Sequence, residues 1–424
     1  MRLGKRLATV VLGTVVAGGG LIAVARADAP KGDWPQFRGP ARDNISKETG
    51  LLKSWPKEGP PLAWKGTGIG DGHSSVAVAG GKIFTTGLDG DGVYAFALNE
   101  ADGKPAWKTK FGGLGNNQES QGGKGSRSTP TVDGDMVYVE GPVGEVYCLA
   151  AADGKEVWHT NLRTDYGGGV PQWGYSDSPV VEGDVVICVP GGRGGTVLGL
   201  DKRTGKEVWR SKGLSDGAHY VSPIVAEIGG VRQAIVMTAA HLAGISPKDG
   251  KVLWVTERKG ATAVIPTPVV KDNYIFVTSG YGVGCDLFKV DAQGGKFSVS
   301  KVYANKNMVN HHGGVILLDG NLYGYSDGKG WVCMDMMTGD IKWKEKEALG
   351  KGTISYADGR FYLRDERKGT IVLIEADPTA FKEVGRFEQP DKSGKPYWPH
   401  LVIANGKLYV RDMDNLFCYD VKAK

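Results

Sequence analysis

Short apolar runs that alternate with polar residues recur along most of the chain, and tight turns rich in Asn, Asp and Gly separate them. Alternation with a period of two, broken by such turns, is the strongest short-range sequence signal for β-hairpins. One unit predicts three antiparallel strands, at Ser75 to Ala79, Lys82 to Thr86 and Gly92 to Leu98. Seven more units of this kind begin near Ser128, Ser178, Ser222, Thr267, Val315, Ile354 and Leu401. The pattern therefore predicts an all-β chain with eight three-stranded units.

A ten-residue motif connects these units to a fourth strand that reaches a tryptophan. Its clearest copy is Leu149 to Trp158 (LAAADGKEVW), in which the glycine allows the positive φ that a tight turn requires. Other copies end at Trp107, Trp209, Trp254 and Trp343, and a worn copy ends at Val299. From Trp64 to Trp343 these positions recur every 43 to 51 residues, which is close to the repeat length of a four-stranded propeller blade.

The two ends of the repeat region complement each other. A region near Val384 provides the fourth strand of the seventh unit. The last unit ends at Asp420 without a fourth strand, whereas the strand around Trp64 has no unit before it. Pairing the two ends completes an eighth blade and closes the ring, which removes exposed sheet edges. We therefore predict an eight-bladed β-propeller of four-stranded antiparallel blades over residues 60–424, closed by an N-terminal strand that completes the last blade.

Residues 1–27 have the features of an export signal. A basic start is followed by an apolar run from Leu7 to Val24 and by the small-residue site Ala25-Arg26-Ala27. The alternative is an uncleaved membrane anchor, because the apolar run is long for a signal. Cleavage predicts an exported protein, periplasmic or extracellular, with no membrane span, and no cysteine follows the run as a lipidation site. Residues 28–59 are irregular, proline-punctuated and aromatic, and predict a strap packed on a surface.

Charge and cysteine usage exclude several classes of protein. The formal charge of +5 falls to about +1 once the signal is removed, so nothing favours binding to nucleic acid or to anionic membranes. The five cysteines include no CxxC pair, and no Cys/His spacing predicts a metal site. We interpret them as buried free thiols in a chain that is expected to be a monomer.

The D-G-K-x-x-W and T-G-K-x-x-W units resemble the repeats of pyrroloquinoline-quinone (PQQ) dehydrogenases and of their non-enzymatic, BamB-like exported relatives. The resemblance covers about residues 60–424 and is specific for fold rather than for activity. It implies that the tryptophan docks against the neighbouring blade near the turn glycine. This structural role would apply to Trp107, Trp158, Trp209, Trp254 and Trp343.

The residues that are candidates for a functional site lie where loops lead into the first strand of each unit. Four of these loops are long, at residues 108–127, 160–177, 300–314 and 383–400, and long loops are often functional. Five of the seven histidines fall at this level, which predicts a ligand site at the funnel mouth. Its candidate residues are His73, Arg127, Trp173, Asp177, His219, Tyr220, Asn310, His311, His312, Trp398 and His400. The alternative is that these histidines only cap backbone groups, and His311 and His312 are not expected to face the funnel together because strand neighbours alternate.

Two functions remain open, and the sequence does not decide whether the chain is an enzyme. The first is a non-catalytic binding or assembly module that takes a small molecule or a protein at the propeller face. It is favoured because the adjacent Cys-Cys pair and the calcium and base motifs implied by a dehydrogenase resemblance are not recognisable.

The second is a divergent PQQ-dependent dehydrogenase that oxidises an alcohol or a sugar. Trp173 or Trp398 would then stack on the quinone, and Arg127 would pair with one of its carboxylates. Asn310 and Asp177 would approach a calcium ion, and Asp177 or Asp327 would act as the base.

Overall fold

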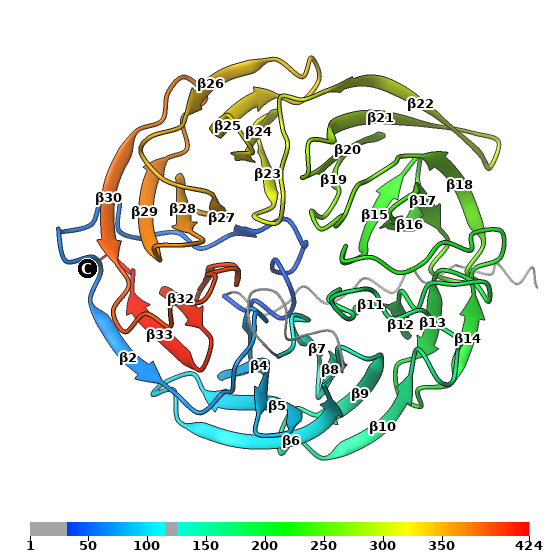
Figure 1. Ribbon diagram of the computed structural model, residues 1–424, viewed down its shortest axis with the longest axis horizontal. Coiled ribbons are helices and arrows are strands. Elements are labelled where there is room, and N and C mark those ends of the chain that lie inside the picture. Colours follow the sequence, from blue (N-terminus) through cyan, green and yellow to red (C-terminus); the bar gives the residue numbers. More distant parts are fainter. Residues whose placement is uncertain (1–31, 115–124, 424) are drawn as a thin grey trace, which may run out of the picture.

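The computed structural model describes residues 32–114 and 125–423, so the predicted export signal and part of the loop at 108–127 lie outside the described residues. Eight antiparallel sheets are arranged radially around a central axis (Figure 1). This arrangement confirms the predicted eight-bladed propeller. No helix within the described ranges is long and apolar enough to cross a membrane.

The first four blades follow each other along the chain, and in each of them the first strand is the innermost. Blade 1 contains β3 (Ala77–Ala79), β4 (Lys82–Asp89), β5 (Gly92–Asn99) and β6 (Pro105–Gly113). Blade 2 contains β7 (Thr131–Asp133), β8 (Met136–Glu140), β9 (Glu145–Ala150) and β10 (Glu156–Asn161). Blade 3 contains β11 (Val180–Glu182), β12 (Val185–Cys188), β13 (Leu198–Asp201) and β14 (Glu207–Arg210). Blade 4 contains β15 (Ile224–Ile228), β16 (Val231–Met237), β17 (His241–Ile245) and β18 (Val252–Glu257).

The remaining blades continue around the ring, and two of them include a strand from the N-terminal segment. Blade 5 contains β19 (Val269–Lys271), β20 (Tyr274–Ser279), β21 (Gly284–Gln293) and β22 (Lys296–Asn305). Blade 6 contains β23 (Val315–Leu318), β24 (Asn321–Ser326), β25 (Gly330–Asp335) and β26 (Ile341–Glu345). Blade 7 contains β27 (Gly352–Ala357), β28 (Arg360–Asp365), β29 (Thr370–Glu375), β30 (Glu383–Glu388) and β1 (Ile45–Ser46). Blade 8 contains β31 (Val402–Ala404), β32 (Lys407–Asp412), β33 (Asn415–Asp420) and β2 (Leu62–Gly66).

Strand β2 closes the ring as predicted. It pairs antiparallel with β33, and Trp64 lies opposite Cys418. The outer strands are longer than expected, because β6 continues to Gly113 and β22 continues to Asn305. Side chains on these outer strands are largely exposed, so they lack the apolar alternation that marks the inner strands.

The blades are joined by contacts between tryptophans and turn glycines, as the resemblance implies. Five indole Nε1 atoms donate hydrogen bonds to backbone carbonyls of the next blade, at Glu100 (3.1 Å, from Trp64), Ala151 (3.1 Å, from Trp107), Lys202 (3.0 Å, from Trp158), Pro247 (2.9 Å, from Trp209) and Asp377 (2.9 Å, from Trp343). Glycine is required at the first four of these joints because a Cβ atom there would lie 2.5–2.6 Å from the indole ring. Apolar clusters made of residues from adjacent blades extend inward from the joints.

Three joints depart from this pattern. Trp254 donates instead to Gln233 of its own blade, at 2.6 Å, while its ring lies in an apolar cluster shared by blades 4 and 5. Val299, predicted to occupy the tryptophan position of blade 5, does not. The position belongs to Tyr303, whose hydroxyl donates to the Met336 carbonyl at 2.8 Å. The β21–β22 hairpin is longer than the other hairpins, and this extra length shifts the joint along the sequence.

In blade 7 the tryptophan comes from outside the blade. Gly385 occupies the joint position, just after the bulge that marks it in the other blades. Trp55 fills the space above it, since a Cβ on Gly385 would lie 2.8 Å from the Trp55 Cβ. The Trp55 ring also packs against Phe387 and Tyr362, at centroid distances of 5.4 and 5.6 Å. The N-terminal segment thus supplies the joint that blade 7 lacks.

Residues 34–46, which we call the plug, lie along the propeller axis (Figure 1). The expectation of a surface strap is wrong for this part of the segment, because Trp34, Arg38 and Arg42 are 2–3% exposed. The physical reason is that the inner strands converge on the axis with backbone groups that need partners. Trp34 exchanges two backbone hydrogen bonds of 2.8 Å with Val78 of blade 1.

Polar side chains of the plug bind backbone carbonyls around most of the ring. Their acceptors are Ser178 (2.9 Å, from Arg42), Pro223 (2.9 Å, from Arg42), Val315 (2.8 Å, from Arg38) and Ile354 (2.5 Å, from Asn44). The backbone carbonyl of Pro35 accepts from Val132, and Asn44 bonds to His400. Together with Trp34, these bonds reach blades 1, 2, 3, 4, 6, 7 and 8.

Substituting Gly154→Ala tests the joint between Trp107 and the following blade. The new Cβ would lie 2.6 Å from the indole ring, on a residue with φ of 73°. We expect a loss of about 2–5 kcal/mol in the free energy of unfolding, measured in urea. The matched control is Gly134→Ala, with φ of 63° and nothing within 4 Å, which should cost about 1–2 kcal/mol. Equal losses would show that the ring contact contributes nothing.

Substituting Arg42→Met tests the plug. It leaves the Ser178 and Pro223 carbonyls inside the ring without their donor, and each orphaned acceptor should cost about 1–3 kcal/mol. We expect a clearly lower urea midpoint than for the control Arg193→Met, which alters an exposed arginine. A midpoint no lower than that of the control would contradict a stabilising role for the plug.

Candidate functional site

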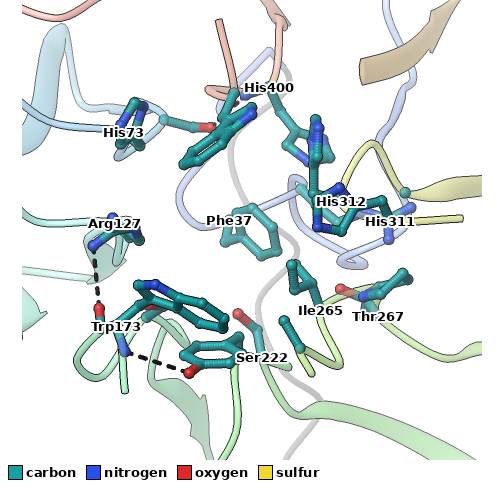
Figure 2. Close-up of a pocket in the computed structure, with 18 of the residues that line it drawn as sticks. Phe37, His73, Arg127, Trp173, Ser222, Ile265, Thr267, His311, His312 and His400 are labelled. Carbon is teal, nitrogen blue, oxygen red and sulfur yellow. Dashed lines mark hydrogen bonds between the residues drawn. The ribbon is translucent and has the colours of Figure 1, made fainter. Parts of the chain in front are cut away.

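A cavity of about 170 Å³ opens at the funnel mouth, on the side where loops lead into the inner strands. Its walls come from the loops before β3, β7, β11, β15, β19, β23 and β31. Its floor is formed by Phe37 and Arg38 of the plug, and Figure 2 shows Phe37 at the centre of the surrounding side chains. The plug and the ring therefore build the cavity together.

Eight of the eleven residues predicted for the site line this cavity. They are His73, Arg127, Trp173, Tyr220, His311, His312, Trp398 and His400. The reason for their convergence is topological, because each of them precedes the innermost strand of its blade. Their role in binding a ligand stays a prediction.

His311 and His312 both line the cavity, so the expectation that they point to opposite sides is wrong. They lie in an irregular bend before β23, where the alternation of a strand does not apply. The Nε2 atom of His311 is 2.9 Å from the Tyr281 hydroxyl. The Nε2 atom of His312 is 2.5 Å from the Glu366 carboxylate.

Three predicted residues do not line the cavity. His219 accepts a 2.9 Å hydrogen bond from the backbone N–H of Val264, which matches the capping alternative. Asn310 holds its own loop, since its side chain accepts from the Gly314 N–H at 3.0 Å and donates to the Tyr325 carbonyl at 2.9 Å. Asp177 is buried between blades 2 and 3.

Sequence reasoning missed Phe37, Arg38, Tyr281 and Glu366. Phe37 and Arg38 belong to the segment that was predicted to pack on a surface. Glu366 lies on the turn between β28 and β29 and not in one of the loops that lead into an inner strand. The aromatic and basic character of the DWPQFRGP stretch was the one available signal for the plug residues.

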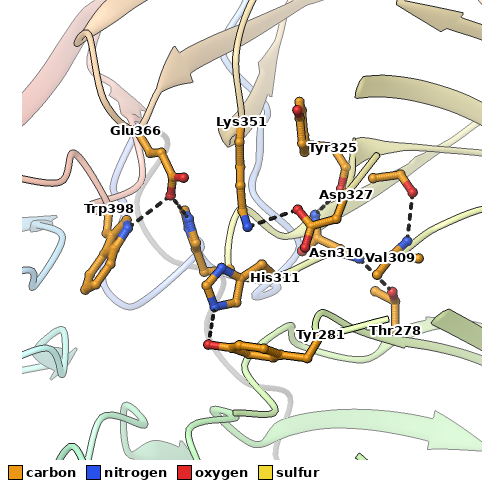
Figure 3. A network of polar contacts seen from close by, with 12 residues as sticks. Thr278, Tyr281, Val309, Asn310, His311, Tyr325, Asp327, Lys351, Glu366 and Trp398 are labelled. Atoms are coloured by element: carbon orange, nitrogen blue, oxygen red, sulfur yellow. Dashed lines mark hydrogen bonds and ion pairs between the residues drawn. The ribbon is translucent and has the colours of Figure 1, made fainter. Parts of the chain in front are cut away.

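A polar network stabilises one wall of the cavity (Figure 3). Glu366 accepts hydrogen bonds from His312 and, at 3.2 Å, from the Trp398 indole. Burial disfavours the ionised form of Glu366, but the hydrogen bond and charge of His312 outweigh it and lower its pKa to about 2. Lys351 and Asp327 form an ion pair of 2.9 Å beside this group. Glu366 is therefore an anion that orients His312 and Trp398.

Two of the histidines at the mouth are neutral at physiological pH. Burial lowers the pKa of His311 to about 3, with a further contribution from His312. Burial and the charge of Arg38 lower the pKa of His400 to about 3 as well. Asn44 lies 2.7 Å from His400 Nδ1, and an amide N–H donor there places the ring proton on Nε2. These two rings offer hydrogen bonds and apolar surface rather than positive charge.

The residues proposed for a PQQ and calcium site do not converge. Asn310 and Asp177 would have to share a cation, yet neither lines the cavity and the Asn310 amide is occupied by backbone partners. Asp327, the other candidate base, is paired with Lys351. Over residues 32–114 and 125–423, no group of three or more His, Cys, Asp or Glu side chains is placed to hold a metal ion. The arrangement does not fit a calcium-assisted quinone centre.

Asp177 faces Glu140 across the interface of blades 2 and 3. Both side chains are at most 1% exposed, and their four carboxyl oxygens receive no hydrogen bond from another described group. Burial raises the pKa of Glu140 well above its usual range, and the neighbouring Asp177 raises it further. Burial also raises the pKa of Asp177 to about 7, although Glu140 and the charge of Arg42 lower it in part. At mildly acidic pH the pair holds protons that the unfolded chain would release.

A family model described as "Outer membrane protein assembly factor BamB" matches residues 53–141 and 96–345. The protein of that name from Xanthomonas campestris pv. campestris is 26% identical over 226 residues, which are 53% of this chain and 49% of the relative. That from Shewanella oneidensis is 24% identical over 383 residues, which are 83% of this chain and 86% of the relative. A third, from Burkholderia pseudomallei, is 26% identical over 53% of this chain and 55% of its own length. The chain thus spans about half the length of the Xanthomonas and Burkholderia relatives.

Solved structures show the same fold at low sequence identity. BamB from Moraxella catarrhalis superposes with a TM-score of 0.60 at 15% identity, over 83% of this chain and 95% of that protein. The quinohemoprotein alcohol dehydrogenase of Comamonas testosteroni gives a TM-score of 0.63 at 12% identity, over 94% and 82% respectively. Because binding proteins and enzymes share this architecture, these likenesses carry the fold alone.

The Glu140–Asp177 pair predicts a pH dependence of stability. Because the folded pKa values lie above the unfolded ones, the contribution is complete below about pH 4 and is lost as the pH rises through 7. Asp177→Asn should flatten the profile of melting temperature between pH 4 and 8, with a gain relative to wild type at the alkaline end. The control Asp135→Asn, at an exposed aspartate, should leave the profile unchanged. A profile for Asp177→Asn parallel to that of wild type would refute the assignment.

Proposed function

The chain belongs to the family described as outer membrane protein assembly factor BamB, and we propose that it is an exported, non-catalytic propeller that binds its ligand at the funnel mouth. In this proposal it works as a binding or assembly module of the cell envelope. The three relatives that carry this name lend support to an assembly role.

The observation that carries the proposal is the composition of the mouth cavity. Aromatic rings, four histidines of which His311 and His400 are neutral, and two arginines line it, whereas no described lining residue is an Asp or a Glu. Pockets with a largely apolar lining and a few oriented polar groups are typical of binding sites. Glu366 is held as an anion and His311 and His400 are held neutral, so these three groups are not poised near neutral pH for general acid–base chemistry.

The second candidate is a PQQ-dependent dehydrogenase. The observation in its favour is that Trp173, Trp398 and Arg127 line the cavity. Bound PQQ would supply an electrophilic quinone, and these three residues would hold its ring and a carboxylate. The calcium ligands and the base are the parts that do not fit, which makes the binding module the better-supported function.

Complementation tests the proposal. In a bacterial host that lacks its own BamB, the full chain, including its predicted export signal, should restore the abundance of outer-membrane proteins. Trp173→Ala combined with Trp398→Ala should abolish most of this rescue, because the aromatic walls of the cavity are lost. The control Val208→Ala, at a residue 50% exposed on the outer strand β14, should rescue like wild type.

Periplasmic abundance and melting temperature must be equal for these variants to be compared. Failure of the folded, exported wild type to rescue would refute the assembly role, and full rescue by the double variant would refute the site. Dye-coupled alcohol oxidation by the purified protein loaded with PQQ and calcium would instead support the dehydrogenase.

A further inference from the structure

Arg38 places an incompletely bonded guanidinium group at the floor of the cavity. Its side chain is 2% exposed, and its Nη2 atom donates to the carbonyls of Asp43 (3.2 Å) and Val315 (2.8 Å). Neither Nε nor Nη1 has a hydrogen-bond partner among residues 32–114 and 125–423. A buried charged donor without an acceptor is costly, so the position favours an external acceptor.

The free Nη1 atom lies on the side of the mouth cavity. Arg38 separates this cavity from a second one of about 220 Å³, which is lined by other plug residues and by the inner strands of blades 4 to 6. A Cβ atom on Gly314 would lie 3.3 Å from both Arg38 Nη1 and His400 Cε1. Gly314 and His400 line the mouth cavity and not the second one, which places Nη1 at the mouth.

The nearby negative charge does not neutralise Arg38 through a hydrogen bond. Asp43 attracts the guanidinium, but its Oδ1 accepts from the backbone N–H of Ile45 at 2.9 Å. Arg127 adds a second partly buried cation to the same cavity, and its Nη1 donates to the Trp173 carbonyl at 3.1 Å. Because no described lining residue is an Asp or a Glu, the incompletely bonded guanidinium of Arg38 favours an anion.

The aromatic side chains that line the mouth cavity favour an anionic ligand that also carries an aromatic ring. Phe37 stands edge-on to His400 at a centroid distance of 5.3 Å, and Trp173 lies 5.5 Å from Tyr220. Trp398 lies 4.7 Å from the His73 ring on another part of the wall. A cavity of about 170 Å³ corresponds to the space of on the order of ten water molecules, which suits one ring or two fused rings.

We propose that the mouth cavity binds an aromatic monocarboxylate, with its carboxylate on Arg38 Nη1 and its ring among Phe37, Trp173 and Trp398. The carboxylate supplies the acceptor that Arg38 lacks, in a charge-assisted hydrogen bond. The ring replaces water along apolar walls. Such a group comes either from a free aromatic acid or from the C-terminal aromatic residue of a peptide. The inference rests on the proposed function, because it names the ligand class of the same site.

Titration calorimetry of the purified mature protein tests the inference. The probes are 2-naphthoate and its uncharged analogue 2-naphthamide, followed by an acetylated tripeptide that ends in phenylalanine, as the free acid and as the amide. We expect each acid to bind about 10-fold or more tightly than its amide, because only the acid pairs with the guanidinium. Tighter binding of 2-naphthoate would identify a free aromatic acid as the source of the ligand, and tighter binding of the tripeptide acid would identify a peptide C-terminus.

Variants locate the contact. Arg38→Gln should remove the preference for acid over amide, whereas Arg193→Gln, at an exposed arginine, should leave it unchanged. If Arg38→Gln does not fold, Trp173→Ala should still weaken binding of both naphthyl probes by losing a wall of the ring site. Equal affinity of acid and amide, or no binding of either acid at millimolar concentration, would overturn the inference. Rescue in the host without BamB, together with such a negative result, would leave the assembly role intact and reject only the ligand class.

Discussion

The propeller depends on how its axis is filled. Eight inner strands converge there, and their carbonyls and N–H groups need partners that a ring of blades cannot supply alone. The plug supplies these partners, because the side chains of Arg38, Arg42 and Asn44 donate hydrogen bonds to backbone carbonyls of different blades. Arg38, together with its neighbour Phe37, also forms the floor of the mouth cavity, so the plug contributes both to the stability of the ring and to the shape of its candidate site.

Around this centre the blades are held by a joint that tolerates several chemical solutions. An indole over a glycine is the commonest, but Tyr303 performs the same task in blade 5 and Trp55 performs it for blade 7 from outside. Each of these joints needs a large flat ring that packs closely against the next blade, and at most joints the ring lies beside a glycine. The repeat motif reflects this packing requirement, so it predicts the architecture and does not predict a ligand.

The blades could be predicted from sequence because β-hairpins are encoded locally, by alternation and by turns such as those around Gly134 and Gly154. Most of the mouth could also be predicted, because topology brings every residue before an inner strand to the same level. The plug, Glu366 and the position of Tyr303 could not. Their places depend on contacts between residues that lie far apart in the chain, such as Arg38 with Val315. His311 and His312 face the cavity together, against the prediction, because they lie in a bend where the alternation of a strand does not apply.

The contacts of the N-terminal segment determine the order in which parts of the fold can form. Trp34 to Trp64 are made before the blades, yet Leu51 bridges to Lys422 and Trp64 lies opposite Cys418. These contacts cannot form until the last blade exists, so this part of an early-synthesised segment is seated last. Loop closure over such separations is slow, and it leaves the growing chain open along its axis throughout synthesis. Completion of the ring therefore has to wait until the last blade has been synthesised.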